Sequence, residues 1–315
     1  MNMQLTASYG KGSWNAVKKW MILCACICLG FGLPVHTAAK SSDGVWDYIV
    51  AQTKESDNLH IHFLDVGQGD SMLIETPSHY TILIDGGDGE AGEKVVALLR
   101  AKGIEELDLV VATHPDIDHI GGLLPVLEEF KVKRVLDSGK LYTTKTYQRY
   151  TEILTEKKIP VSIAKEGTYL SIDPLLSLQV LNANQPGAAN NQASIVLRLT
   201  YRTVDFLLMS DAESQQELKM KYNFEVESEV YKVAHHGSRT SNTRAFLNEV
   251  KPDYAVISYG RDNKLGHPTK EVVRNLRKAG AVIYATAKGG TISIESNGLS
   301  CRISSEKPDP IYGYK

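Results

Sequence analysis

The stretch Thr113-His-Pro-Asp-Ile-Asp-His-Ile-Gly-Gly122 follows directly on the apolar run 107–112. It places four potential metal ligands, His114, Asp116, Asp118 and His119, within six positions. A strand ending in a tight loop presents alternate residues to one side, and the helix that follows turns its first residues toward the same place. Carboxylates this close repel one another unless a cation neutralises them. The stretch therefore predicts two ligand pairs, His114 with Asp116 and Asp118 with His119, for two divalent cations. The alternative is a helix N-cap with surface acids, which does not explain the two flanking histidines.

Strand and helix patterns alternate on both sides of this stretch. A glycine-bearing turn at Gly67 and Gly69 predicts a hairpin, and later crossover helices separate apolar runs. The expected strands are 60–66, 71–75, 80–84, 107–112, 133–136, 176–181, 194–200, 204–209, 230–234, 254–258, 282–285 and 291–295, and the expected helices are 93–102, one from about 119, 144–158 and 270–278. Hairpins and crossover helices in two similar halves predict an α/β fold of two sheets covered by helices on their outer faces.

Polar residues follow other predicted strands as well. Asp85 precedes two glycines after 80–84, and the pair His235-His236 comes after 230–234 before a Gly-Ser turn. A pair of core histidines is the alternative for His235 and His236. His267 shares a loop with Arg261 and Lys264, so either a proton donor, a phosphate contact or a loop histidine fixed by Pro268 fits its position.

Seven motifs in order resemble the metallo-β-lactamase-fold hydrolases, and within them the extracytoplasmic domain of ComEC-type competence proteins. They are His62-Phe-Leu-Asp-Val-Gly-Gln-Gly-Asp70, Ile84-Asp-Gly-Gly87, residues 113–122, Asn191-Gln-Ala-Ser194, Leu208-Met-Ser-Asp211, Val233-Ala-His-His-Gly-Ser238 and Leu265-Gly-His-Pro268. The multi-helix channel of full-length competence proteins is absent from the sequence, which therefore resembles a stand-alone, exported version of that domain.

The resemblance implies an αββα fold with the metal loop at the edge between two mixed sheets. It implies that Asp211 bridges the two metals and that one of His235 and His236 binds metal while the other faces substrate. The superfamily also expects a further histidine between the loop and Asp211, and this chain has none there. Asn191 or water would fill that position. The resulting oxygen-rich site makes Mn²⁺ or Mg²⁺ plausible beside Zn²⁺.

The same resemblance assigns supporting roles around the metals. Asp85 would orient the metal loop by hydrogen bonds rather than ligate. Other residues predicted to support the ligands or contact substrate are Asn191, Ser194, Ser238, Arg261 and Lys264. Asp65 and Asp70 also match, but a polar hairpin turn explains them nearly as well.

The N-terminal segment has the layout of a secretory signal peptide. Lys11, Lys18 and Lys19 precede an uncharged run of 14 residues, 20–33, and small residues follow to Ala39. This run is short for a membrane span, although a retained anchor is the alternative, with lipidation at Cys26 a weaker one. We expect a signal peptide or anchor over 1–39, a linker over 40–58, the domain over 59–304 and a tail over 305–315.

The composition is that of an ordinary folded protein, with 43% hydrophobic and 23% charged residues and a formal net charge of −2 over 315 residues. Loss of 1–39 would leave 32 basic and 37 acidic residues, a net charge of −5. This balance argues against a strongly basic nucleic-acid binder, although a local basic patch can hide within it. One cysteine beyond the leader, Cys301, excludes a disulfide framework and a four-cysteine zinc ribbon.

These features predict an exported metal-dependent hydrolase, secreted or held at the outer face of the cytoplasmic membrane. The resemblance implies a phosphodiesterase or nuclease that attacks DNA with a metal-activated hydroxide. Asp118 would hold the hydroxide with Asp211, and His235 or His267 would protonate the leaving group. One alternative is a lactamase or lactonase, which needs an apolar pocket. The other is a non-catalytic module that binds DNA or another polymer.

Overall fold

The computed structural model describes residues 58–308 and Tyr312. The predicted leader, 1–39, and residues 40–57 of the predicted linker lie outside this described part. Within it, no helix combines the length and apolarity needed to cross a bilayer.

The first sheet has eight strands in the order β17-β16-β1-β2-β3-β5-β7-β8. Its centre is an antiparallel meander, and β5, β7 and β8 then run parallel to β3. The C-terminal pair β16 and β17 adds antiparallel strands beside β1. The strands are β1 (Leu59–Phe63), β2 (Met72–Glu75), β3 (Thr81–Ile84), β5 (Leu109–Ala112), β7 (Val135–Asp137), β8 (Val161–Ile163), β16 (Ile292–Ser296) and β17 (Cys301–Ser305). The short strands β4 (Glu106–Leu107) and β6 (Lys131–Val132) form a separate pair.

The second sheet repeats this plan. Its order is β15-β14-β13-β12-β11-β10-β9, with antiparallel strands from β9 to β12 and parallel strands from β12 to β15. The strands are β9 (Tyr169–Leu170), β10 (Leu176–Asn182), β11 (Val196–Tyr201), β12 (Val204–Leu208), β13 (Val230–Lys232), β14 (Tyr254–Ile257) and β15 (Val282–Ala285). The prediction of two similar halves is therefore confirmed.

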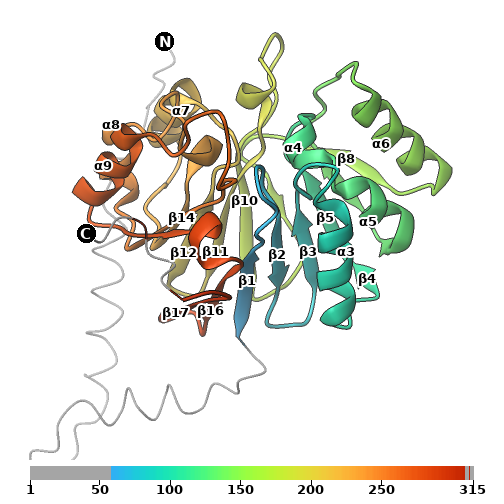
Figure 1. Ribbon diagram of the computed structural model, residues 1–315, viewed down its shortest axis with the longest axis horizontal. Helices are drawn as coiled ribbons and strands as arrows, with labels where there is room; N and C mark the ends of the chain where they lie inside the picture. Colours follow the sequence, from blue (N-terminus) through green and yellow to red (C-terminus); the bar gives the residue numbers. More distant parts are fainter. Residues whose placement is uncertain (1–57, 309–311, 313–315) are drawn as a thin grey trace, which may run out of the picture. The chain divides into compact units, whose positions relative to one another are not determined.

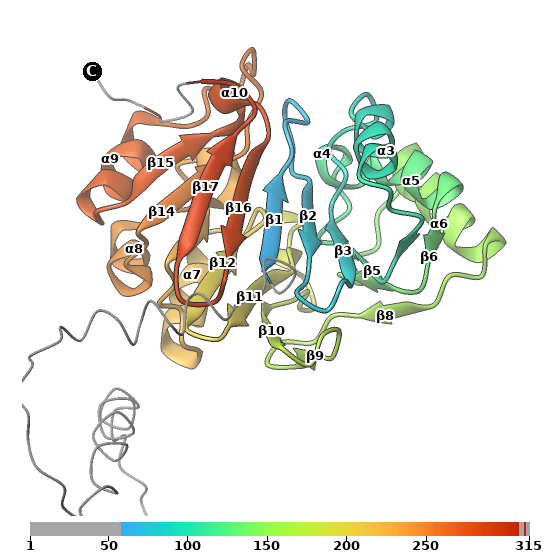
Figure 2. The same ribbon diagram turned by 90° about the horizontal axis from the view of Figure 1, so that it is seen from below.

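Four layers result from the way the apolar residues are placed. Alternate residues of both sheets, such as Ile61, Ile74 and Phe206, are buried between the sheets. The opposite faces pack under helices: α3, α5 and α6 cover the first sheet, and α7, α8 and α9 cover the second (Figures 1 and 2). The helices are α3 (Gly92–Ala101), α4 (Ile117–Ile120), α5 (Leu123–Glu129), α6 (Lys145–Glu156), α7 (Ser214–Asn223), α8 (Arg244–Val250), α9 (Lys270–Lys278) and α10 (Thr286–Gly289). This confirms the αββα architecture.

Several elements differ from the sequence prediction. The predicted strand 107–112 is two strands, because the main chain is interrupted at Asp108, whose carboxylate accepts a hydrogen bond from the amide of Thr81. Helices α7 and α8 were not predicted. Only Met220 and the carboxyl-bearing Glu217 of α7 are buried, so its sequence has almost no apolar periodicity.

The topology brings the predicted motifs to one edge. Parallel strands that neighbour one another end on the same side of a sheet, and the loops after β5, β12 and β13 carry residues 113–122, Asp211 and His235-His236. These loops meet where the corresponding ends of the two sheets face each other (Figure 1).

Candidate metal centre

Asp85, at the end of β3, holds the loop that follows β5. Its Oδ1 accepts a hydrogen bond from the amide of Thr113 at 2.9 Å, and its Oδ2 accepts from Thr113 Oγ1 at 2.7 Å and from His119 Nδ1 at 2.8 Å. All three side chains are buried. Because Nδ1 of His119 donates to this carboxylate, its Nε2 is left as the nitrogen that faces the centre.

Two glycine pairings allow the backbone of this loop to lie close to its neighbours. A Cβ on Gly122 would come within 2.0 Å of the carbonyl oxygen of Gly86, and a Cβ on Gly69 within 2.1 Å of that of Asp118. Only glycine fits at these contacts. The glycines thus fix the backbone at Asp118 relative to the turn between β1 and β2, and the backbone at Gly122 relative to the end of β3.

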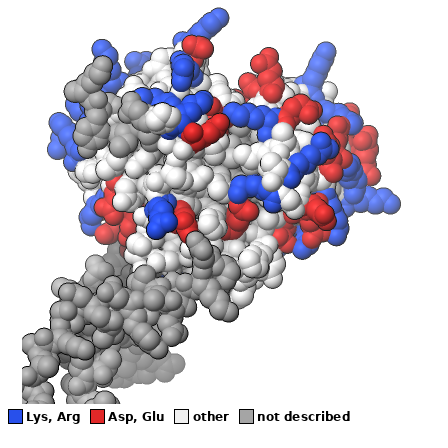
Figure 3. Space-filling model, turned by 60° about the horizontal axis from the view of Figure 1, so that its bottom comes forward, with Lys and Arg blue, Asp and Glu red and all other residues white. Residues whose placement is uncertain are grey.

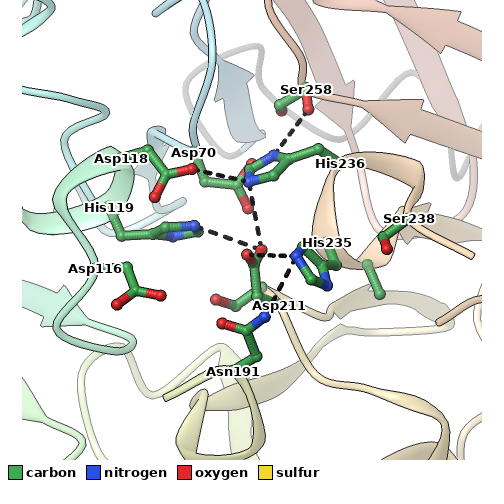
Figure 4. Close-up of polar contacts among 12 residues, drawn as sticks. Asp70, Asp116, Asp118, His119, Asn191, Asp211, His235, His236, Ser238 and Ser258 are labelled. Carbon is green, nitrogen blue, oxygen red and sulfur yellow. Dashed lines mark hydrogen bonds and ion pairs between the residues drawn. The ribbon is translucent and has the colours of Figure 1, made fainter. Parts of the chain in front are cut away.

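One cluster forms around His236 (Figure 4). His236 Nδ1 donates to the carbonyl of Ser258 at 3.0 Å, which leaves Nε2 directed inward. This Nε2 lies 3.5 Å from Asp118 Oδ2 and 3.5 Å from Asp211 Oδ1, and the latter lies 3.4 Å from His119 Nε2. Two carboxylates and two imidazoles thus converge on one point.

A second cluster forms around the other oxygen of Asp211. Its Oδ2 lies 3.9 Å from Nε2 of His114 and 3.7 Å from Nε2 of His235, and Asp116 Oδ2 lies 3.6 Å from His114 Nε2. Asn191 comes to the same side, with Nδ2 3.3 Å from His235 Nε2. Asp211 therefore stands between the two clusters, with one oxygen toward each.

Four of the converging atoms lack hydrogen-bond partners in the described part of the chain. Nε2 of His114, His119 and His236 and Oδ1 of Asp211 are buried and make no hydrogen bond within the described part of the chain. Polar atoms buried in this way are costly unless a ligand or ion satisfies them. The donor set of imidazole nitrogens and carboxylate oxygens fits divalent cations.

The charges of the cluster support the same conclusion. Burial lowers the pKa of His114 to about 3, so this imidazole is neutral and its Nε2 can ligate. Burial acts against a charge on His119 and His236, yet nearby carboxylates, Asp211 foremost, raise the pKa of His119 well above its ordinary value and that of His236 to about 10. The carboxylates thus require positive charge at these two nitrogens, which a proton or a divalent cation supplies.

An unusual backbone conformation aims His235 and His236 at different clusters. Both have positive φ, 49° and 52°, a region that residues other than glycine seldom occupy. Asn242 holds the turn by accepting from the amide of Ala234 at 3.0 Å and donating to its carbonyl at 2.9 Å. Backbone strain of this kind, fixed by buried hydrogen bonds, is concentrated at functional sites.

The sequence left Asp70 between a family match and a residue of a polar turn, and the structure shows that it lies in the turn before β2 but is not a surface residue. Asp70 is fully buried and forms an ion pair with Lys232, also fully buried, at 2.8 Å. His236 Nδ1 lies 3.5 Å from the same carboxylate. Burial raises the pKa of Asp70, but Lys232 and His236 outweigh this effect and lower it below its ordinary value. A lysine within the apolar run 230–234 was the only sequence signal for this pair.

The remaining predicted residues are divided between the centre and its surroundings. Ser194 Oγ lies 3.4 Å from His114 Nδ1, and Ser238 Oγ contacts Thr240 rather than a predicted ligand. The ring of His267 lies 5.7 Å from that of His235. Two residues do not join the cluster: Arg261 donates to the carbonyl of Ala287, and Lys264 is exposed, with no hydrogen bond or ion pair to a described residue.

Comparison with known proteins matches this geometry. The model of the metallo-beta-lactamase superfamily covers residues 64–261, a span that includes both clusters. The chain belongs to this superfamily.

Its relatives include competence proteins, as the motifs indicated. The chain is 31% identical over 251 residues to ComE operon protein 3 of Bacillus subtilis and 29% identical over 230 residues to competence protein ComA of Neisseria gonorrhoeae. The matches cover 74% and 72% of this chain but 32% and 31% of the relatives, so the chain spans about a third of their length. Among solved structures, Igni18, a metallo hydrolase from Ignicoccus hospitalis, is similar in fold, with a TM-score of 0.50 and 16% identity over 76% of this chain and 100% of that chain.

Proposed function

We propose that this member of the metallo-β-lactamase superfamily is a hydrolase that cleaves phosphodiesters with two divalent cations, and that DNA is its substrate. The observation that carries this proposal is the arrangement of Asp211, which presents one carboxylate oxygen to each of two clusters of ligand atoms, with Nε2 of His114, His119 and His236 unpartnered within the described residues. One carboxylate shared in this way suits a bridged pair of cations.

The donor atoms assign residues to each cation. The first would be held by His114, Asp116, His235 and Asp211 Oδ2, and the second by Asp118, His119, His236 and Asp211 Oδ1. His235 thus takes the place of the histidine that the chain lacks before Asp211, with Asn191 beside it. Both histidines of the pair would ligate, whereas the sequence resemblance implied one.

Cations bound there would supply a nucleophile at neutral pH and stabilise charge that develops on the phosphoryl oxygens. The chain's own groups set the geometry. Asp116 and Asp118 are the ligands on the solvent side, with 30% and 28% of their side chains exposed, whereas Asp211 is 5% exposed. His267 Nδ1 is buried without a partner in the described structure, and its ring neighbours His235, so we assign it to protonate the leaving group.

The substrate proposal rests on the ligand set and the relatives. Three carboxylates against four imidazoles make the site richer in oxygen than an all-histidine site, which favours Mn²⁺ or Mg²⁺ beside Zn²⁺ and suits phosphate chemistry. The names of the relatives point to competence, for which DNA is the natural polymer. We further propose that the segment 1–39 directs export, so that cleavage takes place outside the cytoplasm.

Cleavage of DNA by metal-stripped protein tests this function. Linear and circular, single- and double-stranded DNA would be incubated with added Mn²⁺, Mg²⁺ or Zn²⁺, with Asp118→Ala as the inactive variant. Metal-dependent cleavage that is lost in the variant is the expected result. Intact DNA with every metal, from protein shown to bind two cations, would contradict the DNA proposal and direct attention to small phosphodiesters, lactones and lactams.

A further inference from the structure

A groove with strongly basic walls opens beside the metal centre. It has a volume of about 480 Å³ and lies between the loop 239–243, the start of α8 and helix α9. Four cationic side chains line it, Arg239, Arg244, Arg274 and Lys278, against one carboxylate, Glu271. All four cations are exposed to solvent.

These four cations differ from the ion-paired cations found elsewhere on the surface of the protein. None of them forms an ion pair within the described residues, whereas elsewhere Arg149 contacts Glu128 at 2.8 Å and Lys251 contacts Glu227 at 3.0 Å. On the face shown in Figure 3, basic and acidic side chains are interspersed around a largely uncharged centre. Cations gathered in a concave surface without acidic partners attract an anionic ligand.

The loop 239–243 connects the groove with the metal centre. Arg239 is three residues from His236, a separation of at most about 10 Å along the chain. Thr240 Oγ1 lies 3.2 Å from His235 Nδ1, and Ser241 Oγ donates to the carbonyl of Ala212, next to Asp211, at 2.8 Å. An extended anion bound at the centre therefore needs only a short further length to enter the groove.

A second groove, on another side of the centre, has an excess of acidic side chains. This groove of about 460 Å³ follows the hairpin turn that leads to Asp70, and its lining has four carboxylates and two cations. The carboxylates belong to Asp65, Asp88, Glu90 and Asp262, and the cations to Lys94 and Arg261. Both cations are engaged, since Lys94 contacts Asp65 and Arg261 donates to Ala287. A polyanion would thus be directed along α8 and α9.

We propose that the basic groove between loop 239–243 and α9 binds the phosphate backbone of a nucleic-acid strand on one side of the bond that is cleaved. This proposal rests on the proposed phosphodiesterase function and extends it. The substrate is then a polynucleotide several phosphates long rather than a small diester, and its binding depends on salt through the groove arginines.

The test compares two substrates in the metal-loaded full chain, a labelled oligonucleotide and bis(para-nitrophenyl) phosphate. The double variant Arg244→Gln/Arg274→Gln removes two groove charges. The matched control, Arg100→Gln/Arg302→Gln, removes two exposed arginines from α3 and β17. We expect the groove variant to raise KM for the oligonucleotide about tenfold and to reduce the slope of log affinity against log salt by about 0.7 for each arginine. Arg244→Lys/Arg274→Lys should restore both values.

Hydrolysis of the small diester separates the two proposals. Its kcat/KM should be the same in the groove variant and the control. An unchanged KM and salt slope for the oligonucleotide would overturn the groove proposal while leaving the hydrolase intact. If neither substrate is cleaved, the proposed function fails. The groove proposal is then tested by itself, by comparing the affinity of the groove variant and of the control for the oligonucleotide with fluorescence anisotropy. Poly-glutamate that competes as strongly as DNA would overturn nucleic acid as the ligand.

Discussion

Nζ of Lys232 lies 2.8 Å from Oδ1 and 2.9 Å from Oδ2 of Asp70, and neither side chain is accessible to solvent. Lys232 belongs to β13 in the second sheet, and Asp70 to the turn before β2 in the first. The ion pair thus connects the two sheets next to His236, whose Nδ1 is 3.5 Å from the same carboxylate.

Lys232→Met should destabilise the fold by about 3–5 kcal/mol, because it leaves the carboxylate of Asp70 buried without its cation. Urea unfolding measures this change. Asp70→Asn/Lys232→Met should recover part of the loss, and Lys251→Met, at an exposed ion pair, should cost much less than Lys232→Met. Equal losses at Lys232 and Lys251 would contradict the structural role of the pair.

Asp85→Asn should weaken metal binding about 10- to 100-fold, because the carboxylate that orients His119 and the metal loop is lost. Competition with a chelating dye measures the affinity. Asp108→Asn is the matched control. This aspartate also accepts a backbone hydrogen bond, from the amide of Thr81, but at the opposite end of β3 from Asp85. A folded Asp85→Asn protein with unchanged affinity would show that the loop holds His119 without this hydrogen bond.

His235→Ala and His236→Ala should each reduce the metal content from two ions to about one, because the two imidazoles face different oxygens of Asp211. Metal analysis of dialysed protein checks this, with His60→Ala as the control on β1. A His235→Ala protein that retains two ions would remove His235 from the ligand set.

Glu75→Gln should make the stability less dependent on pH in the acid range. Hydrogen bonds from His62 and Lys102 lower the pKa of Glu75 to about 2. A lowered pKa means that the carboxylate stabilises the fold above its unfolded pKa of about 4.3 and loses this effect as the pH falls toward 2. Urea unfolding should show that the free energy of unfolding of the variant at pH 7 is about 1 kcal/mol lower than that of the wild type, and that this deficit shrinks below about pH 4. A difference that is constant with pH would contradict this assignment.

The sequence predicted the layers and most of the centre because these depend on local patterns. Apolar strands with ligands at their ends identify residues 113–122 and the pair His235-His236 without knowledge of the packing, and the family resemblance adds Asp211. The pairing of Asp70 with Lys232 joins residues 162 positions apart, so no local pattern contains it. Likewise, the directions of His235 and His236 depend on a left-handed turn held by Asn242, and the sequence alone left them open.

The basic groove escaped prediction for a related reason. Its arginines come from the loop after His236, from α8 and from α9, and α8 was not predicted. The net charge of the chain is slightly negative, which hides a local excess of cations.

The most direct test of the central claim is a titration of metal-stripped protein with Mn²⁺ while hydrolysis of bis(para-nitrophenyl) phosphate is recorded. We predict that activity rises until two ions are bound per chain, and that Asp211→Ala abolishes it. Protein that binds two ions, retains its fold and hydrolyses no phosphodiester would contradict the account.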